Sequence, residues 1–237
     1  MKIPKQQLLP FIDNEKLYSI VFCVLMCEKS PAGEYTKIDS NVVDPFSAVF
    51  DALRQGITLK EWLRQEEARQ KQKTLQNALG VFHQAIIGSI HSGWENIPVG
   101  HVIDVCNKSK KIIAEIKNKF NTTKGSDKKT IYDNLNSQLK TSYNGFTGYY
   151  VEIIPKRRGL YNLPFTPSDN VLKNTRPVNQ KIRVIDGKSF YALATGIPDA
   201  LEMLYKILPR VIADILKTDP GIVCKDQLFN DLFTRAY

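Results

Sequence analysis

The segment that most constrains the fold is a pair of β-rich runs joined by a polar turn. The runs are "HVIDVC" at 101–106 and "KIIAEIKNK" at 111–119, and the turn is Asn107 to Lys110. Apolar and polar residues alternate in the second run, as in a strand with one buried face. The pattern predicts a β-hairpin in which Cys106 pairs with Lys111, so that two neighbouring strands are placed by local sequence alone.

Helices are predicted before and after this hairpin. Apolar residues recur every three or four positions in 13–28 and 46–91, and "DPFSAVFDALRQG" has an Asp-Pro start and a Gly stop. Residues 127–140 begin with Asp127 and carry one apolar stripe, so this helix is expected to pack on the sheet. The segment "PDALEMLYKILPRVIADIL" predicts a closing helix, bent at Pro209.

Further strands are expected late in the chain. The run "GYYVEIIP" is strongly β-forming, and "KIRVIDGKSFYALATG" predicts a second hairpin that turns at Asp186-Gly187. The sequence therefore predicts an α/β fold, with a mixed central sheet flanked by helices. We expect residues 1–237 to form a single catalytic domain.

Composition excludes several classes of protein. The hydrophobic fraction of 43% supports a core, and the apolar run at 19–27 is too short to cross a bilayer. The N-terminal residues do not resemble a secretory signal, so we expect a cytoplasmic protein without a membrane partner. The four cysteines lie mostly among apolar neighbours and are expected to be reduced core residues. The three histidines lack the spacing of a metal site.

Positive charge is concentrated in one part of the chain. Residues 107–188 contain 17 Lys and Arg against 6 Asp and Glu, whereas the remainder contains 16 against 18. A surface evolved only for solubility mixes its charges, so an excess confined to one block indicates a polyanionic partner. Nucleic acid fits better than a membrane because no basic amphipathic anchor helix is evident.

The predicted hairpin brings two acids together inside this basic block. With residues 107–110 as the loop, Asp104 faces Ile113, and Glu115 and Lys117 share their face. Asp104 and Glu115 are then diagonal neighbours, with Cβ atoms roughly 7 to 8 Å apart. Two carboxylates at this separation are expected to close around a divalent cation.

Phosphodiester hydrolysis needs positive charge at the phosphate and an activated water, which these residues would supply. Mg²⁺ held by Asp104, Glu115 and the carbonyl of Ile116 is the expected cofactor, and Lys117 is expected to orient or activate the water. An Asp followed ten residues later by Glu-x-Lys is a weak pattern alone. Its place on one face of a hairpin strengthens it.

Three stretches carry a resemblance to a known family. "GWENIPVGHVIDV", "IIAEIKNKFNTTKGSDKKTIYD" and "LPFTPSDN" resemble the type II restriction endonucleases that cut at GGNCC, members of the PD-(D/E)xK superfamily. The resemblance implies a restriction-endonuclease-like fold and Mg²⁺-dependent cleavage of double-stranded DNA by a homodimer, with a cognate DNA methyltransferase in the same system. It places Asp104, Glu115 and Lys117 at the three motif positions.

Two positions qualify the resemblance. Ile103 occupies the position of the proline from which the superfamily motif takes its first letter. This proline is often missing in the superfamily. Many such nucleases also carry an acid on the helix before the motif strand. Gln84 in "FHQAIIGSI" is expected to be a neutral substitute there, although a plain helix-surface role is an open alternative.

Base recognition is expected from residues 155–183, a basic DNA-recognition segment. Arginine suits guanine because it can bond O6 and N7 together, whereas lysine more often meets phosphate. An irregular basic loop without base contacts is the alternative, and the polar residues after the hairpin also suit a simple turn. The predicted DNA-binding residues are Lys119, Asn121, Thr122, Lys124, Lys156, Arg157, Arg158, Lys173, Arg176, Lys181 and Arg183.

Two other functions are compatible with the same residues. A DNA-binding protein without catalysis would carry the same basic block, and a structure-specific repair or junction nuclease would share Asp104, Glu115 and Lys117. The sequence by itself does not reveal the recognition site, the cut position or the dimer surface.

Overall fold

The structure is a computed structural model that describes residues 3–27, 43–98, 102–123, 125–156, 158–169 and 173–237. It divides into two compact units. Unit 1 comprises Met1–Val21 and Phe82–Tyr237, and unit 2 comprises Phe22–Val81. In the described ranges, no helix is long and apolar enough to span a bilayer. The expectation of a single catalytic domain stays a prediction.

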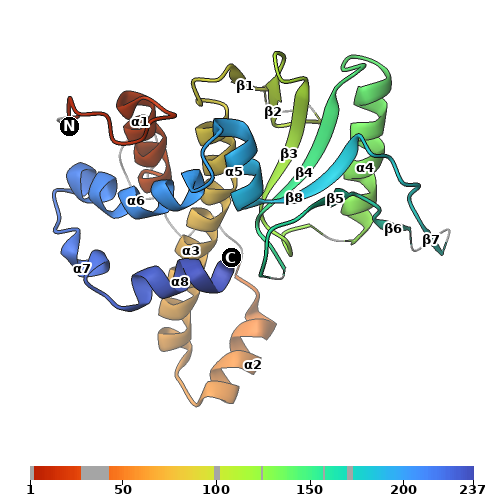
Figure 1. The fold of residues 1–237 in the computed structure, drawn as a ribbon. Helices are drawn as coiled ribbons and strands as arrows, with labels where there is room; N and C mark the ends of the chain where they lie inside the picture. The colour runs from red at the N-terminus through yellow and green to blue at the C-terminus, as the bar shows by residue number, and fades with distance from the viewer. Residues whose placement is uncertain (1–2, 28–42, 99–101, 124, 157, 170–172) are drawn as a thin grey trace. The chain divides into compact units, whose positions relative to one another are not determined.

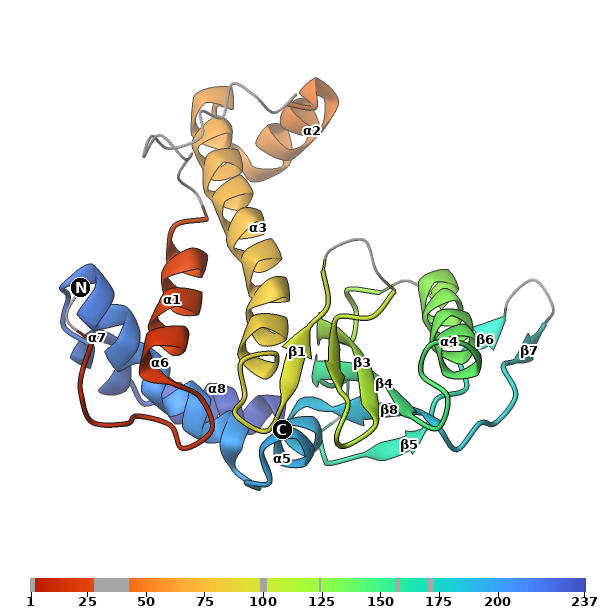
Figure 2. The same cartoon turned by 90° about the horizontal axis from the view of Figure 1, so that it is seen from above.

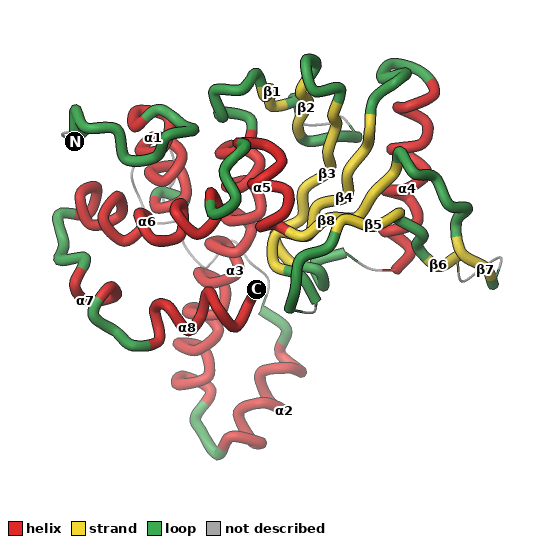
Figure 3. Tube along the Cα trace, in the orientation of Figure 1, coloured by secondary structure: helices red, strands yellow, loops and turns green. Residues whose placement is uncertain are grey.

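Unit 1 is built on a mixed sheet, which Figure 1 shows as adjacent arrows and Figure 3 as adjacent yellow segments. In the described part of unit 1 the sheet has six strands, in the order β1-β2-β3-β4-β8-β5. Strands β3, β4 and β8 are parallel, and the other pairings are antiparallel. The strands are β1 Trp94–Asn96, β2 Val105–Asn107, β3 Ile112–Lys119, β4 Thr147–Ile154, β5 Asn162–Pro164 and β8 Ile182–Asp186. The predicted mixed sheet is confirmed.

Helix α4, Gly125–Lys140, connects the parallel strands β3 and β4 and covers one face of the sheet, as Figure 2 shows. Its buried Leu135 belongs to one core cluster with Ile113 of β3 and Tyr150 of β4. This confirms the predicted helix at 127–140. A parallel pair needs such a crossover because the chain must return to the same end of the sheet.

The opposite face of the sheet packs on α5, Gly187–Thr195. The rings of Tyr149 and Phe190 lie 5.8 Å apart. Because successive side chains of a strand alternate, Tyr149 faces α5 while Tyr150 faces α4. Further helices are α1 Asn14–Leu25, α6 Ala200–Leu216, α7 Gly221–Cys224 and α8 Leu228–Ala236. Pro209 lies inside α6, as predicted.

The predicted second hairpin is wrong. The chain leaves β8 and enters α5 at the position of the expected turn, because the Asp186 carboxylate caps the helix by accepting from the Ser189 N–H at 2.9 Å. A short Asp-Gly pair suits a turn, but Asp is also a preferred N-cap residue. Gly187 is required for a different reason, since a Cβ there would lie 2.3 Å from the Ile153 carbonyl oxygen.

The first hairpin forms with a register two residues away from the prediction. Cys106 pairs with Ile113 and not with Lys111. The loop is therefore 108–111, and Lys111 adopts a left-handed conformation with φ 53° to complete it. A shift of two residues, unlike a shift of one, leaves every side chain on its predicted face.

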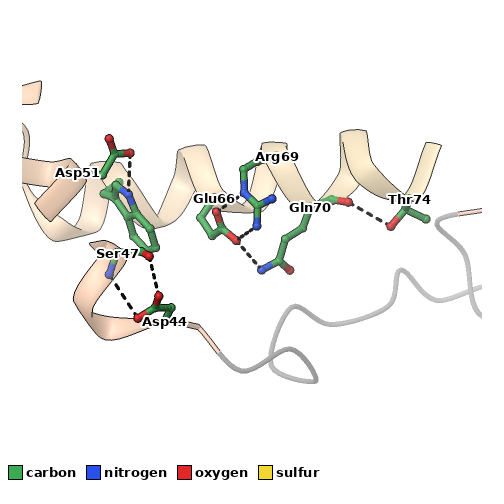
Figure 4. Close-up of polar contacts among 8 residues, drawn as sticks. Asp44, Ser47, Asp51, Glu66, Arg69, Gln70 and Thr74 are labelled. Atoms are coloured by element: carbon green, nitrogen blue, oxygen red, sulfur yellow. Dashed lines mark hydrogen bonds and ion pairs between the residues drawn. The ribbon is translucent and has the colours of Figure 1, made fainter. Parts of the chain in front are cut away.

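Unit 2 contains α2, Pro45–Gln55, and most of α3, Leu59–Ile87. Both ends of α2 form as predicted. Asp44 accepts from the N–H of Ser47, and Gly56 ends the helix in a left-handed conformation with φ 67°. Figure 4 shows the Asp44–Ser47 contacts. Helix α3 begins with a capping box, because Thr58 and Glu61 each bond the backbone N–H of the other.

Several features were not predicted. Short strands β6 Ser168–Asp169 and β7 Asn174–Thr175 pair within the predicted recognition segment, where a loop was expected. Strands β1 and β5, at the two edges of the main sheet, were also missed. All four cysteines are free, but Cys23 and Cys224 are exposed, so the core prediction is wrong for them.

Candidate active site

The Asp104 carboxylate continues the hydrogen-bond ladder between β2 and β3. The Asp104 N–H donates to the Ala114 carbonyl at 2.9 Å, although Ala114 pairs in register with Val105. The Ile116 N–H then donates to Asp104 Oδ2 at 2.6 Å, where the next backbone partner would stand. This bond fixes the orientation of the carboxylate relative to β3.

Glu115 lies across from Asp104, and Lys117 follows it on the same face. Lys117 Nζ donates to Glu115 Oε1 at 2.6 Å, and the two side chains are 31% and 14% exposed. Asp104 and Glu115 are also within hydrogen-bonding reach of each other. The corrected register brings the two acids closer together than the predicted diagonal arrangement.

Burial sets the electrostatics of this carboxylate pair. It raises the pKa of Glu115 to about 7, with a further rise from the neighbouring charge of Asp104. Burial likewise raises the pKa of Asp104, against the opposing hydrogen bond from Ile116. Two buried acids of like charge resist being ionised together unless a positive charge joins them.

Gln84 lies near this pair. It is close to the end of α3, and its side chain is within hydrogen-bonding reach of the Asp104 carboxylate. The structure therefore brings Gln84 to the pair, as expected from its place on the helix before the hairpin. Its part in catalysis stays a prediction.

The donor set suits a hard divalent cation with few protein ligands. Carboxylate oxygens are the preferred donors for Mg²⁺, which usually keeps several waters and binds one or two carboxylates together with substrate phosphate. Across the described ranges, no cluster of three or more His, Cys, Asp and Glu residues forms a candidate metal site. Asp104 and Glu115 fit Mg²⁺ because they are largely buried and adjacent. When both are ionised, their two negative charges exceed the single positive charge of Lys117. The Ile116 carbonyl as a third ligand stays a prediction.

A second polar group lies beside the pair and was missed from the sequence. Glu152 of β4 is in register with Lys117 on the same face, and its side chain is 9% exposed. It accepts from Lys128 Nζ at 2.6 Å and from the Tyr161 hydroxyl at 2.7 Å. The alternation of "YVEI" in β4 was the available signal, because it places Tyr150 and Glu152 on the face of Glu115.

The predicted DNA-binding residues after β3 form a turn. Thr122 Oγ1 donates to the Lys119 carbonyl at 2.7 Å, and Lys119, Asn121 and Thr122 are exposed. Lys124 and Arg157 lie outside the described residues. This turn is adjacent in sequence to the strand that carries Glu115, so its polar side chains follow the candidate site closely.

Within 155–183 the lysines and arginines differ in exposure and in their protein partners. Lys156, Lys173 and Lys181 are exposed, as is Arg158, whose Nε donates to the Arg235 carbonyl at 3.2 Å. Arg176 instead forms ion pairs with Asp133 at 2.7 Å and with Asp169 at 3.1 Å.

Arg183 donates from Nε to the side-chain oxygen of Asn162 at 2.5 Å. Reading a base would require Arg176 or Arg183 to release these protein partners. DNA contact by the basic residues of this segment stays a prediction.

Comparison with known proteins assigns the chain to a family. Residues 9–217 match the Eco47II restriction endonuclease family. The type II restriction enzyme Eco47II of Escherichia coli is 43% identical over 220 residues, which cover 90% of each chain. The type II restriction enzyme Sau96I of Staphylococcus aureus is 32% identical over 215 residues, covering 89% of this chain and 82% of the relative. No solved structure matches.

These matches define the class as type II restriction endonuclease, a site-specific deoxyribonuclease of a restriction–modification system. The chain belongs to the Eco47II restriction endonuclease family. The predicted resemblance is thereby confirmed, and DNA is the substrate. A repair or junction nuclease and a non-catalytic DNA-binding protein are the less fitting alternatives.

The raised pKa of Glu115 predicts how stability depends on pH when no divalent cation is present. The native state keeps a proton on Glu115 up to about pH 7, whereas the unfolded chain releases it near pH 4.3. The free energy of unfolding should therefore fall as pH rises from about 4.3 through 7, by up to about 4 kcal/mol. Glu115→Gln should remove most of this fall, as measured by urea unfolding at pH 5 and pH 8 in EDTA.

The exposed Glu95 offers a matched control, because its side chain is 55% exposed. Glu95→Gln should keep the wild-type pH dependence. Adding Mg²⁺ at pH 8 should stabilise the wild type and leave Glu115→Gln nearly unchanged. Equal pH dependence in the wild type and Glu115→Gln would show that the pair is not buried as described.

Proposed function

We propose that the chain hydrolyses phosphodiester bonds of double-stranded DNA at GGNCC, in a reaction that depends on Mg²⁺. The observation that supports this most is the buried pair of Asp104 and Glu115 with Lys117 on the same face of a sheet. The recognition sequence rests on the resemblance of the stretches quoted from residues 93–170 and on membership of the family. The fold proposed is the restriction-endonuclease-like fold of the PD-(D/E)xK superfamily, with Ile103 replacing the motif proline.

The chain's own side chains would divide the chemistry between them. Asp104 and Glu115 would hold Mg²⁺, with Ile116 supplying its carbonyl. The cation supplies positive charge where negative charge develops on the phosphate. Lys117 would orient the attacking water, since its ammonium lies 2.6 Å from Glu115 and reaches the same face. Gln84 would hold the Asp104 carboxylate in place.

The basic block would bind the DNA backbone on both sides of this site. Exposed lysines are suited to phosphate contact, and each neutralised phosphate releases counterions. We propose that residues 1–237 act as one catalytic domain in which 155–183 is the DNA-recognition segment. The proposed DNA contacts are Lys119, Asn121, Thr122, Lys124, Lys156, Arg157, Arg158, Lys173, Arg176, Lys181 and Arg183.

The remaining partners follow from the two-fold symmetry of the proposed site and from the family. A site read alike on both strands suits a homodimer that presents one active site to each strand. A cognate DNA methyltransferase is expected in the same restriction–modification system, to protect the host DNA. The compartment proposed is the cytoplasm, where that DNA lies.

Substitutions at the carboxylate pair should separate cutting from binding. Glu115→Ala removes a ligand and a negative charge, so Mg²⁺-dependent cutting should fall at least about 100-fold while DNA affinity stays equal or rises. Asp104→Ala should behave in the same way. Lys117→Ala should lower cutting about 10²- to 10⁴-fold and weaken binding only modestly. Plasmid cleavage and filter binding measure the two effects.

Lys108→Ala is the matched control, because Lys108 is an exposed turn lysine that pairs with Glu95 at 3.2 Å. It should change neither quantity much, and circular dichroism should report folded protein for all four variants. A folded Glu115→Ala protein that cuts at the wild-type rate would refute the proposed site, leaving Glu115 as a countercharge among lysines.

The recognition segment offers a test of base reading against phosphate binding. Arg158→Ala and Arg183→Ala should each cost roughly 1 to 3 kcal/mol on GGNCC DNA, and much less on random DNA, if the arginine bonds guanine. Lys156→Ala should weaken both about equally and reduce the salt dependence. Parallel losses on both DNAs for every arginine variant would mean that the segment acts only through charge.

A further inference from the structure

Helix α2 of unit 2 has an unusual distribution of apolar residues. It buries its small side chains, Ala48 and Ala52, against Trp62 of α3. Its large apolar side chains point the other way. Phe46, Val49, Phe50 and Leu53 are 76%, 49%, 78% and 77% exposed. We name these four residues the α2 seam.

The spacing of the α2 seam is that of a helix-pairing surface. Its residues stand at i, i+3, i+4 and i+7, which is the narrow stripe through which one helix packs on another. Single exposed apolar residues are ordinary, but four adjacent ones on one helix mark an interaction site. The stripe is too short and too apolar to bind the DNA backbone, which proteins bind through positively charged side chains.

We propose that the α2 seam binds the α2 seam of a second copy of this chain, forming the two-fold contact of the DNA-cutting dimer. The inference rests on the proposed function, because cutting both strands of a two-fold site requires two active sites. An isologous contact needs a surface that complements itself. A seam centred on Val49 and Phe50 satisfies this when the two helices run antiparallel.

The charges at the ends of α2 favour the same antiparallel arrangement. Asp44 caps the N-terminus, and Arg54 stands in the last turn. Antiparallel pairing brings each Arg54 toward Asp44 of the partner subunit and also aligns opposite ends of the two helix dipoles. Arg54 already bonds Asp51 at 2.7 Å, yet its side chain is 79% exposed and has further donors to offer.

The size of the seam indicates a contact that DNA completes. Its four side chains would bury roughly 400 to 500 Å² on each copy, whereas a stable complex commonly buries about 800 Å² per partner. The free dimer should therefore be weak. Two copies bound to one duplex are held at high effective concentration, so the same contact then closes readily.

Sedimentation of the full chain with a duplex carrying one GGNCC site tests the proposal. Phe46→Asp/Leu53→Asp should raise the dissociation constant of the dimer at least about 30-fold. It should give one chain per duplex at concentrations where the wild type gives two. The matched control is Ile222→Asp/Leu232→Asp, at side chains 75% and 58% exposed on α7 and α8. The control should behave as the wild type.

An unchanged stoichiometry and dissociation constant in the seam variant would overturn the proposal. So would loss of the dimer in the control alone, because the contact would then lie on the C-terminal helices. A lower melting temperature with unchanged dimerisation would mean that the seam packs within its own chain, which also overturns the proposal.

A crosslinking experiment covers the case in which the seam variant fails to fold. Val49→Cys lies near the proposed two-fold axis, so two copies should form a disulfide when oxidised glutathione accepts the thiol electrons and GGNCC duplex is present. The variants used for crosslinking also carry Cys23→Ser and Cys224→Ser, because these two cysteines are exposed. Gln55→Cys, at the end of α2, should not crosslink. Absence of the Val49→Cys dimer would contradict the proposal.

Plasmid cleavage then separates this inference from the proposed function. A wild-type protein that dimerises through the seam but does not cut with Mg²⁺ would defeat the proposed function and leave the seam intact. When the wild type does cut, the seam variant should accumulate nicked circles, because single copies cut one strand at a time. Direct linearisation by the seam variant would count against the seam.

Discussion

The hydrogen bond from the Ile116 N–H to the Asp104 carboxylate, at 2.6 Å, is the contact on which the candidate site depends. Through this bond the Asp104 side chain extends the hydrogen bonding between β2 and β3. It thereby fixes Asp104 against β3, the strand that carries Glu115. Because both acids are largely buried, the charge of Asp104 raises the cost of ionising Glu115. The sheet thus holds two acids whose joint ionisation is favoured when a divalent cation and the adjacent Lys117 supply positive charge.

The rest of unit 1 supports this strand pair. Helix α4 connects β3 to β4 and covers the face on which Glu115 stands, while α5 packs on the other face. The parallel pairing of β3 with β4 sets Lys117 beside Glu152, which Lys128 and Tyr161 hold in turn. Glu115, Lys117 and Glu152 therefore stand on strands, and Asp104 directly precedes β2, a placement that suits chemistry requiring exact positioning.

The sequence predicted the site better than the details of the fold around it. Alternation within "IIAEIKNK" placed Glu115 and Lys117 on one face, and that assignment survived a register error of two residues because side chains repeat every two positions. The four-residue loop ends at Lys111 because this residue adopts φ 53°. The composition of the loop does not reveal that conformation. Helix α5 was missed because Asp186 satisfies the rules for both a turn and a helix cap. The two ion-pair partners of Arg176 were also not predicted, since Asp133 and Asp169 come from different elements.

A crystal structure of the chain with a cognate duplex and Ca²⁺, a hard cation that binds carboxylate oxygens as Mg²⁺ does, tests the central claim most directly. The account predicts a cation held by Asp104 and Glu115, with oxygen distances of about 2.3 to 2.6 Å, and in contact with the scissile phosphate. Lys117 should lie beside the attacking water. A cation bound elsewhere, with Asp104 and Glu115 remote from any phosphate, would contradict it.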